Sequence, residues 1–436
     1  MDKDPIAEAA HAQRDASLPR VVIVAEHASA RFGGEAILPL HYFRFLRDRG
    51  VEVWLVVHER TRKELEQAID AQDQDRIKYI PDTIGHRAMW RIGKRLPRRV
   101  AVILTGFPMH LLTQWLQRSI VRKLVDDKRI DIVHEPIPVS PKQPSLMYNV
   151  GAPVIIGPMN GGMTFPPAFK HMESKFERYL IGIGRSTSGF ANRLIPGKRR
   201  AKLLLVANER TRKAIPLGIK TKVIELVENG VDLRVWNEAS QSGAACSEAD
   251  ECIRFLYMGR LIDLKAIDIL LEALSVLKAQ EIGCDIRLDI LGDGDERARL
   301  ENLTEEFGLD RVVEFHGFLP QDQCAVRLAQ CDALVLPSLH ECGGAVVLEA
   351  MAMSKPVIAT DWGGPADYLD ERCGILLPPD GRESLISGFA KAMRQLAESK
   401  NLRDQLGRAG RVKVEEEYDW NTKINQVLSI YRSVRK

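Results

Sequence analysis

The 436-residue sequence contains no run of about 18 apolar residues, so we expect no membrane-spanning helix. Its start, MDKDPIAEAAHAQRD, has neither a basic segment nor an apolar core, and we expect no secretory signal. The seven cysteines form no CxxC pair and no Cys/His spacing typical of zinc ligands. These absences favour reduced thiols in a cytoplasmic protein without a structural metal.

The net charge of only +3 gives no argument for a nucleic-acid partner, but the charge is unevenly distributed. Residues 1–200 carry 32 Lys and Arg against 21 Asp and Glu, whereas the remainder carries 30 against 38. WRIGKRLPRR at 90–99 and the stretch 165–200 mix cations with apolar side chains. Such surfaces bind anionic lipid headgroups, and the alternative is a solvated basic face. Peripheral contact with the cytoplasmic leaflet is therefore one expectation.

Two series of strand-length apolar runs alternate with amphipathic, helix-length stretches. The first series predicts strands at 21–25, 51–57, 101–106, 131–135, 153–157 and 202–208. The second predicts strands at 253–259, 287–292, 312–317, 333–338, 356–360 and 374–379. Nearly continuous Val, Ile and Leu runs are typical of parallel strands covered on both faces. The pattern predicts an α/β protein with two doubly wound domains.

The polar stretch NEASQSGAACSEADE predicts a linker at 237–251. We therefore place an N-terminal domain at 1–236 and a C-terminal domain at 252–417. Residues 418–436 are expected to form a helix that crosses back toward the first domain. Two facing doubly wound domains make a cleft at the carboxyl ends of both sheets, where helix N-termini favour an anionic ligand.

The motif HECGGAVVLEAMA at 340–352 follows a predicted strand and opens a helix. Glu341 and Glu349 flank glycines and helix-opening amides, an arrangement that suits an anion and sugar hydroxyls. The alternative is a helix N-terminal turn with a capping glutamate. The residues that would approach the ligand through their backbone are Gly344, Ala345, Val346 and Val347.

A second motif, MGRLIDLKAIDILLEAL at 258–274, places Arg260 after a strand and Lys265 at the start of a helix. Cations at a helix N-terminus oppose the helix dipole, and a bound diphosphate would resolve this conflict. The alternative is a solvated basic pair.

Three weaker signals lie at other strand ends. Gly33 and Gly34 form a tight turn in RFGGEA, and His134 ends the strand of DIVHEP. Gly292 and Gly294 lie in LGDGDE. For each, a plain turn or a structural histidine is the alternative to a role at the ligand.

Taken together and in order, Arg260…Lys265, LGDGDE, VVEFHGFL, Glu341-x7-Glu349 and PVIATDWGGPADYL resemble the retaining glycosyltransferases of family 4, which have the GT-B fold. The resemblance is specific over 203–378. It is weaker over 20–200, where GPMNGGMTFPP at 157–167 matches the general layout.

The resemblance implies a role for each motif. Arg260 and Lys265 would bind the donor diphosphate, Glu349 the ribose hydroxyls, and Glu341 the transferred sugar. Gly344 and the following amides would lie along the phosphate and sugar. Gly33 and Gly34 would close on the donor, and His134 would lie at the acceptor side. No metal or other cofactor is expected.

Three positions depart from the family's usual pattern. Ala266 follows Lys265 where glycine is usual, Gly343 precedes Gly344 where Phe-Gly is common, and Ser354 follows the EAMA helix where glycine is usual. A left-handed backbone at Ser354 would cost free energy in a non-glycine residue.

The expected activity is transfer of a sugar from a UDP- or GDP-sugar to a glycan, lipid-linked or other glycoconjugate acceptor, in bacterial cell-surface polysaccharide or glycolipid synthesis. The alternatives are another GT-B enzyme, such as a sugar-nucleotide epimerase or a glucan synthase, and a non-catalytic protein that binds nucleotide sugars.

Overall fold

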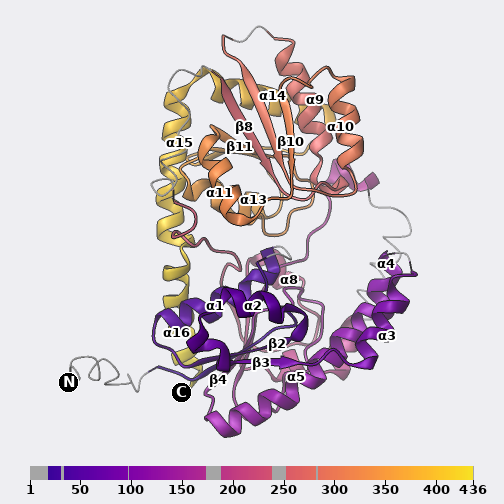
Figure 1. The fold of residues 1–436 in the computed structure, drawn as a ribbon, viewed down its shortest axis with the longest axis vertical. Helices are drawn as coiled ribbons and strands as arrows, with labels where there is room; N and C mark the ends of the chain where they lie inside the picture. Colours follow the sequence, from indigo (N-terminus) through magenta and orange to yellow (C-terminus); the bar gives the residue numbers. More distant parts are fainter. Residues whose placement is uncertain are drawn as a thin grey trace, which may run out of the picture.

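The computed structural model describes residues 18–30, 34–96, 98–172, 188–237, 252–280 and 283–435. Two α/β domains lie one above the other, with the N-terminal domain at the bottom of Figure 1. All but the first residue of the predicted linker, 238–251, lies outside the described residues.

The N-terminal sheet has seven parallel strands in the order β3-β2-β1-β4-β5-β6-β7. The strands are β1 (Val21–Val24), β2 (Val53–His58), β3 (Ile77–Ile80), β4 (Ile132–Glu135), β5 (Val154–Met159), β6 (Leu203–Val206) and β7 (Val223–Glu225). Because all run in one direction, their carboxyl ends share one edge of the sheet.

The second sheet has six parallel strands in the order β10-β9-β8-β11-β12-β13. These are β8 (Ile253–Met258), β9 (Ile286–Leu291), β10 (Val313–Gly317), β11 (Ala333–Leu336), β12 (Val357–Thr360) and β13 (Gly374–Leu377). The prediction of two doubly wound domains is confirmed.

Helices cover the faces of both sheets (Figure 1). The first domain has α1 (Gly34–Asp48), α2 (Arg62–Ala68), α3 (Ile84–Gly93), α4 (Arg98–Ala101), α5 (Phe107–Lys128), α7 (Gly197–Arg200) and α8 (Glu209–Lys213). The second has α9 (Ile267–Lys278), α10 (Arg297–Glu306), α11 (Gln321–Gln330), α12 (Ala345–Ala352), α13 (Gly364–Tyr368), α14 (Arg382–Glu398) and α15 (Lys400–Lys413).

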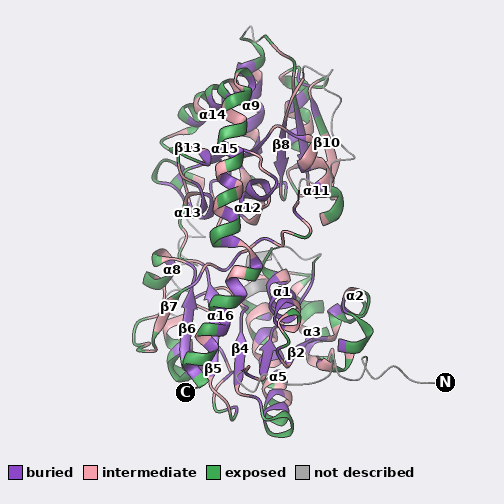
Figure 2. Ribbon diagram, turned by 90° about the vertical axis from the view of Figure 1, so that its left-hand side faces the viewer, coloured by how far each residue is buried: buried purple, intermediate pink, exposed green. Residues whose placement is uncertain are grey.

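The strands form the buried centre of each domain because their apolar side chains are covered on both faces (Figure 2). In β1, Val21 and Ile23 pack into one core layer, and Val22 and Val24 pack into the layer on the opposite face. This alternation explains why the sequence reads as an uninterrupted apolar run.

The last helix, α16 (Trp420–Arg435), leaves the second domain and packs on the first, which confirms the prediction for the C-terminus. Its Trp420 is fully buried and stacks on Phe45 of α1, with ring centroids 5.7 Å apart. Arg49 also binds the side chain of Asn421. The helix therefore ties the two ends of the chain together.

The sequence prediction was wrong for 101–106, which is helical and leads into α5. Thr105 donates its hydroxyl hydrogen bond to the carbonyl of Ala101, four residues earlier. Short apolar runs do not distinguish a strand from a buried helix by periodicity. The prediction also missed β3 and β7, which are short edge strands with fewer buried residues.

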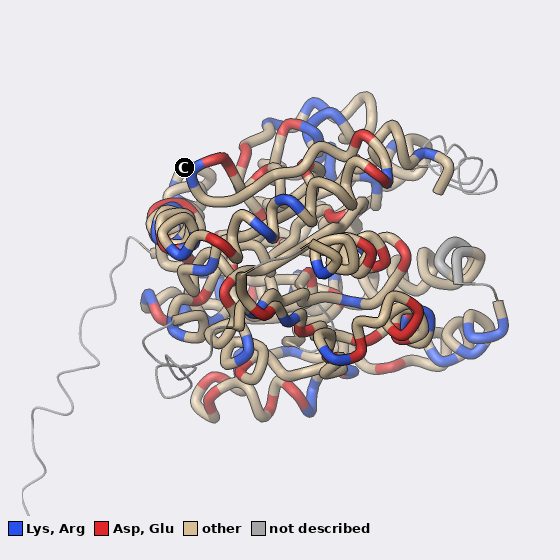
Figure 3. Tube along the Cα trace, turned by 90° about the horizontal axis from the view of Figure 1, so that it is seen from above, with Lys and Arg blue, Asp and Glu red and all other residues tan. Residues whose placement is uncertain are grey.

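Within the described residues, no helix has the length and apolar character needed to cross a lipid bilayer. The helix α3 lies at the side of the first domain and includes Arg87 and Arg91 (Figure 1). Figure 3 shows cations at the same side of the molecule. Trp90 is 52% exposed on this helix, and the ammonium of Lys94 lies 3.9 Å from the centre of its ring. The predicted mixture of cations and aromatic surface is therefore present on α3.

Candidate active site between the two domains

The loops that follow the strands of the second sheet pack closely on one another. A Cβ atom at Gly292 would lie 1.9 Å from the carbonyl oxygen of Gly259, and one at Gly294 would lie 2.2 Å from that of Leu261. Gly292 also has a φ of +135°. These two glycines are required by loop packing behind Arg260, which gives them a structural reason independent of a ligand.

Lys265 and Glu341 form an ion pair at this edge. Lys265 lies in the turn before α9, and Glu341 follows β11, so the fold joins residues 76 positions apart. Their side chains are 12% and 17% exposed. The ammonium and the carboxylate predicted to handle phosphate and sugar are therefore bound to each other.

Arg260 is exposed after β8, and its carbonyl oxygen accepts a hydrogen bond from the hydroxyl of Tyr257 at 3.1 Å. Burial raises the pKa of Tyr257 well above its usual range, and the Glu341 carboxylate raises it further while Arg260 opposes the shift. The charges of Glu341 and Arg260 therefore both act on the hydroxyl of Tyr257. Arg260, Lys265 and Glu341 therefore lie at the same edge of the sheet, and the diphosphate-binding role that the motif predicts stays a prediction.

The helix α12 starts at this group. Gly344 takes a left-handed conformation, with a φ of +66°, at the N-cap of the helix. The amides of Ala345, Val346 and Val347 form the first turn, where backbone donors have no partner four residues earlier, and that of Val347 donates to the carbonyl oxygen of Gly344 at 3.0 Å. This arrangement is the helix N-terminus that the sequence predicted.

Glu349 lies one turn further along α12 and is half-buried. Desolvation raises the pKa of its carboxyl to about 8. Its charge in turn contributes to the raised pKa of the Cys324 thiol, which is about 12 mainly because of burial. Among the residues described, no cation forms an ion pair with Glu349. Hydrogen bonds from hydroxyl groups would stabilise the ionised form of this carboxyl and lower its pKa.

Two of the three departures from the family pattern have left-handed backbones. Ala266 has a φ of +49° and Ser354 a φ of +55°. The cost predicted for a non-glycine residue at 354 is therefore present in the structure. At the third departure, a Cβ atom at Gly343 would lie 2.7 Å from Oε1 of Glu228 and 2.5 Å from Nδ2 of Asn229.

Glu228 belongs to a buried polar cluster that the sequence analysis missed. Its Oε1 accepts hydrogen bonds from Nδ2 of Asn160 and from Nδ2 of Asn229, and burial raises the pKa of its carboxyl. Lys423 of α16 donates to the carbonyl oxygens of Glu228 and Asn229. Burial lowers the pKa of Lys423 to about 7. The signal available in the sequence was a charged residue before an Asn-Gly turn.

The loop after β5 forms contacts between the first domain and the second. Nδ2 of Asn160 donates to the carbonyl oxygen of Cys342 at 2.9 Å. The indole of Trp362 donates to the carbonyl oxygen of Thr164 at 2.8 Å. Arg210 of α8 forms an ion pair with Asp367 at 2.9 Å. The stretch 157–167 thus contacts the loop of Glu341 directly. In the sequence, this stretch matched only the general layout of the family.

The structure does not support the predicted acceptor-side role of His134. The residue is fully buried in β4, and its Nε2–H donates to the carbonyl oxygen of Gly157 at 2.5 Å. Its Nδ1 accepts a hydrogen bond from the Tyr431 hydroxyl at 2.7 Å, and burial lowers the pKa of the ring to about 4. Both nitrogens are occupied, so His134 anchors α16 to the sheet.

The predicted glycine turn has no observed contact with the donor side. Gly33 lies outside the described residues. Gly34 is exposed as the first residue of α1, and a Cβ atom there would meet no atom within 4 Å. The role predicted for this pair therefore stays a prediction.

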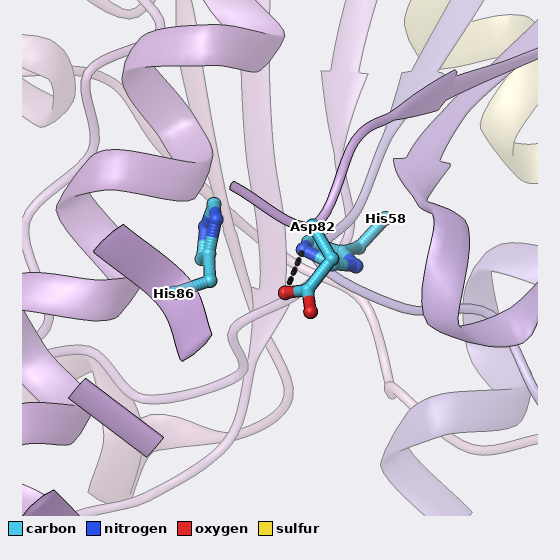
Figure 4. A group of neighbouring side chains, drawn as sticks. All are labelled: His58, Asp82 and His86. Atoms are coloured by element: carbon cyan, nitrogen blue, oxygen red, sulfur yellow. Dashed lines mark ion pairs between the residues drawn. The ribbon is translucent and has the colours of Figure 1, made fainter. Parts of the chain in front are cut away.

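His58, Asp82 and His86 bring possible metal-ligand atoms within 4.8 Å of one another at the ends of β2 and β3 (Figure 4). The backbone N–H of Arg60 donates to Nδ1 of His58, and that of Thr83 donates to Nδ1 of His86. Each neutral ring therefore carries its proton on Nε2. Nε2 of His86 contacts Thr113 at 3.0 Å. These hydrogen bonds occupy the lone pairs that a metal needs, so the three residues do not fit a metal site.

Comparisons with known proteins agree with this geometry. Residues 247–413 match the family model for glycosyl transferases group 1. The D-inositol 3-phosphate glycosyltransferase of Nocardioides sp. is 32% identical over 230 residues, which is 49% of this chain and 49% of that protein. The lipopolysaccharide core biosynthesis glycosyltransferase LpsE of Rhizobium meliloti is 34% identical over 154 residues, or 35% and 42%. The chain thus spans about half the length of the curated relatives it matches.

The similarity in fold extends over nearly the whole chain. Alr3699/HepE of Anabaena, solved in complex with UDP-glucose, matches with a TM-score of 0.61 at 15% identity, covering 95% of this chain and 99% of that one. The shared fold, the two parallel sheets and the matched family model lead to one assignment. The chain has the two-domain GT-B fold, and its residues 247–413 match the glycosyl transferases group 1 family.

Proposed function

We propose that this chain is a retaining, metal-independent glycosyltransferase that moves a sugar from a nucleotide diphosphate sugar to a glycan, lipid-linked or other glycoconjugate acceptor. The observation that carries the proposal is the group of Arg260, Lys265 and Glu341 at the carboxyl edge of the second sheet. Glycosyltransferase relatives over this half of the chain support the same reaction class.

Arg260 and Lys265 would bind the diphosphate and stabilise the negative charge that grows on it as it leaves. Fixed cations and helix-end amides at such a site stabilise a transition state by a few kcal/mol, about 2.7–4 for one donor. Lys265 must first exchange its Glu341 partner for phosphate oxygens. The freed carboxylate would then accept hydrogen bonds from the sugar hydroxyls.

Glu349 would hold the ribose. Its partly buried position next to the α12 N-terminus suits two neighbouring hydroxyls, which are donors that a carboxylate accepts well. Gly344 and the first-turn amides would lie along the phosphate and the sugar.

The reaction would retain the anomeric configuration by front-face transfer. The anomeric carbon–oxygen bond to phosphate breaks through an oxocarbenium-like state, and the leaving phosphate oxygen takes the proton of the acceptor hydroxyl. The new bond forms between that hydroxyl oxygen and the anomeric carbon. His134 is buried and both of its ring nitrogens have partners, so it would not accept this proton. The donor phosphate is therefore the base in this scheme.

We propose a UDP- or GDP-sugar as donor and an acceptor of bacterial cell-surface polysaccharide or glycolipid synthesis. Alr3699/HepE was solved with UDP-glucose, and LpsE takes part in lipopolysaccharide core biosynthesis. These relatives support the donor class and the acceptor class respectively.

The cations and exposed Trp90 of α3 support a peripheral contact with anionic lipid on the cytoplasmic face of the membrane. In a flotation assay, the protein should float with phosphatidylglycerol vesicles and not with phosphatidylcholine vesicles. Failure to float with either would remove this part of the proposal.

Three other functions are compatible with the same fold. A sugar-nucleotide epimerase or a glucan synthase would release different products from the donor, and a non-catalytic binding protein would show no turnover. Product analysis with UDP- and GDP-sugars separates all three from the proposed transfer.

The first experiment is calorimetric titration with UDP, GDP and ADP, with Glu349→Ala as the comparison. Selective binding of one nucleotide, weakened at least about tenfold in the variant, is the expected result. Binding of none of them, or equal binding by Glu349→Ala, would contradict the proposed donor site.

A further inference from the structure

The first domain contains a cavity whose described wall does not include Arg260, Lys265 or Glu341. Its volume is about 900 Å³, which is within the range of pockets for small molecules. It lies between the segment 188–199 and the segment 210–219, with Lys142 and Gly162 completing the wall.

The described wall of this cavity is strongly basic. It includes five cationic residues and neither Asp nor Glu. The cationic residues are Lys142, Arg193, Arg199, Arg210 and Lys213. Among the described ion pairs, two carboxylates bind these cations: Asp367 binds Arg210 at 2.9 Å, and the exposed Glu209 lies 3.9 Å from the ammonium of Lys213. Such a concentration of one charge favours an anionic ligand.

Two polar atoms of the wall lack a hydrogen-bond partner among the described residues. They are Nε of Arg210 and Oδ1 of Asn192. Asn192 is only 2% exposed, and its Nδ2 already donates to the carbonyl oxygens of Lys142 and Ser188. A buried acceptor without a donor costs free energy. A ligand that carries a hydroxyl beside its anionic group would satisfy both atoms.

One loop separates this cavity from the donor half. Gly162 belongs to the cavity wall. The side chain of the next residue, Met163, lies so close to Gly363 that a Cβ atom there would be 2.6 Å from its Cε. Thr164 then accepts the hydrogen bond from Trp362. The loop that lines the cavity at Gly162 is therefore the loop that contacts the Glu341 segment through Asn160.

The rim of the cavity adds apolar surface. Phe190 is 64% exposed, and Leu217 is fully exposed. Apolar side chains of this size beside cations are typical of surfaces that receive a phosphate attached to an apolar group.

We propose that this cavity binds the phosphate group of the acceptor, with a neighbouring acceptor hydroxyl donating to Asn192. The inference rests on the proposed function, because it assigns the acceptor of that reaction. The shared chemistry is a phosphorylated polyol or sugar, either free in solution or as the headgroup of a lipid.

The test uses the full chain saturated with UDP, so that the donor phosphate site is filled. The probe in solution is sn-glycerol 3-phosphate, and the membrane probe is vesicles of phosphatidylcholine with phosphatidylglycerol. Arg193→Gln with Lys213→Gln removes two cations of the wall and leaves the Arg210–Asp367 pair intact. Lys63→Gln with Arg432→Gln removes two exposed cations elsewhere and serves as the matched control.

We expect the cavity variant to bind sn-glycerol 3-phosphate at least about tenfold more weakly, with the control unchanged. If only vesicle binding weakens, the ligand is a lipid headgroup. If neither probe responds to the cavity variant while UDP still binds, the inference is wrong and the proposed function stands. If UDP does not bind to any variant or to the wild type, the proposed function fails instead.

Discussion

Lys265 and Glu341 neutralise each other across the start of α9 and the loop after β11. Each is a residue that the sequence assigned to a different part of the donor. The cation and the carboxylate thus form one ion pair, and in the proposed function a diphosphate would compete with Glu341 for Lys265. This relationship leads to two predictions on the site itself.

Lys265→Met should lower kcat for transfer by about 100- to 1000-fold, because one fixed donor to the leaving phosphate is lost. It should also lower the free energy of unfolding by about 1–3 kcal/mol, because the mostly buried Glu341 carboxylate loses its partner. Steady-state kinetics and thermal unfolding measure the two effects. Lys391→Met, an exposed cation on α14, is the control and should change neither. Near-normal turnover in Lys265→Met would contradict the proposed role.

Glu341→Gln should bind UDP several-fold more tightly than the wild type, because Lys265 is released from its ion pair. The same variant should transfer sugar more slowly, because it loses the carboxylate that holds the sugar hydroxyls. Calorimetry with UDP and kinetics with the matching UDP-sugar give the two values. Weaker UDP binding in Glu341→Gln would show that the pair does not compete with the nucleotide.

Nucleotide binding should release a proton from Glu349. Its pKa of about 8 makes it largely protonated at pH 7, and hydrogen bonds from ribose hydroxyls favour the ionised form and lower that pKa. UDP affinity should therefore rise as the pH increases toward 8. Calorimetry at pH 7 in two buffers of different ionisation enthalpy measures the released proton. Glu349→Gln should release none, and equal release by both proteins would refute the assignment.

Tyr431→Phe should destabilise the fold by about 1–3 kcal/mol, because Nδ1 of the buried His134 loses its donor. Since His134 lies in the core, kcat should stay within about twofold of the wild type. Chemical denaturation and kinetics test the two statements. Tyr148→Phe is the matched control, because no hydrogen bond of its hydroxyl is described. A large loss of kcat with unchanged stability would restore a catalytic role for His134.

Ser354→Gly should stabilise the protein by about 1 kcal/mol, because a left-handed residue other than glycine carries a steric cost. For a domain of this size the melting temperature should rise by about 2 °C or more. Ser387→Gly, at an exposed position inside α14, should have the opposite sign, because glycine weakens a helix interior. A lower melting temperature for Ser354→Gly would contradict the argument.

The sequence predicted two doubly wound domains, the helix that crosses back and the edge at which the donor motifs lie, but it misassigned 101–106 and missed the edge strands β3 and β7. Apolar runs buried on both faces specify parallel strands, and residues after such strands share an edge in any parallel sheet. For this reason Arg260, Lys265 and Glu341 could be placed together from residues far apart in the chain. The left-handed position of Ser354 was expected from the family's usual glycine after this helix, because many helices end with one left-handed residue.

The pairing of these groups and the burial of the polar residues became visible only in the folded protein. His134 ends a strand as expected, but α16 returns from the far end of the chain and covers it with Tyr431. The cluster around Glu228 and the basic cavity at Asn192 likewise depend on segments brought together by packing. Whether a single polar side chain is buried depends on residues far away in the sequence. The periodicity of its own helix or strand therefore does not predict its burial.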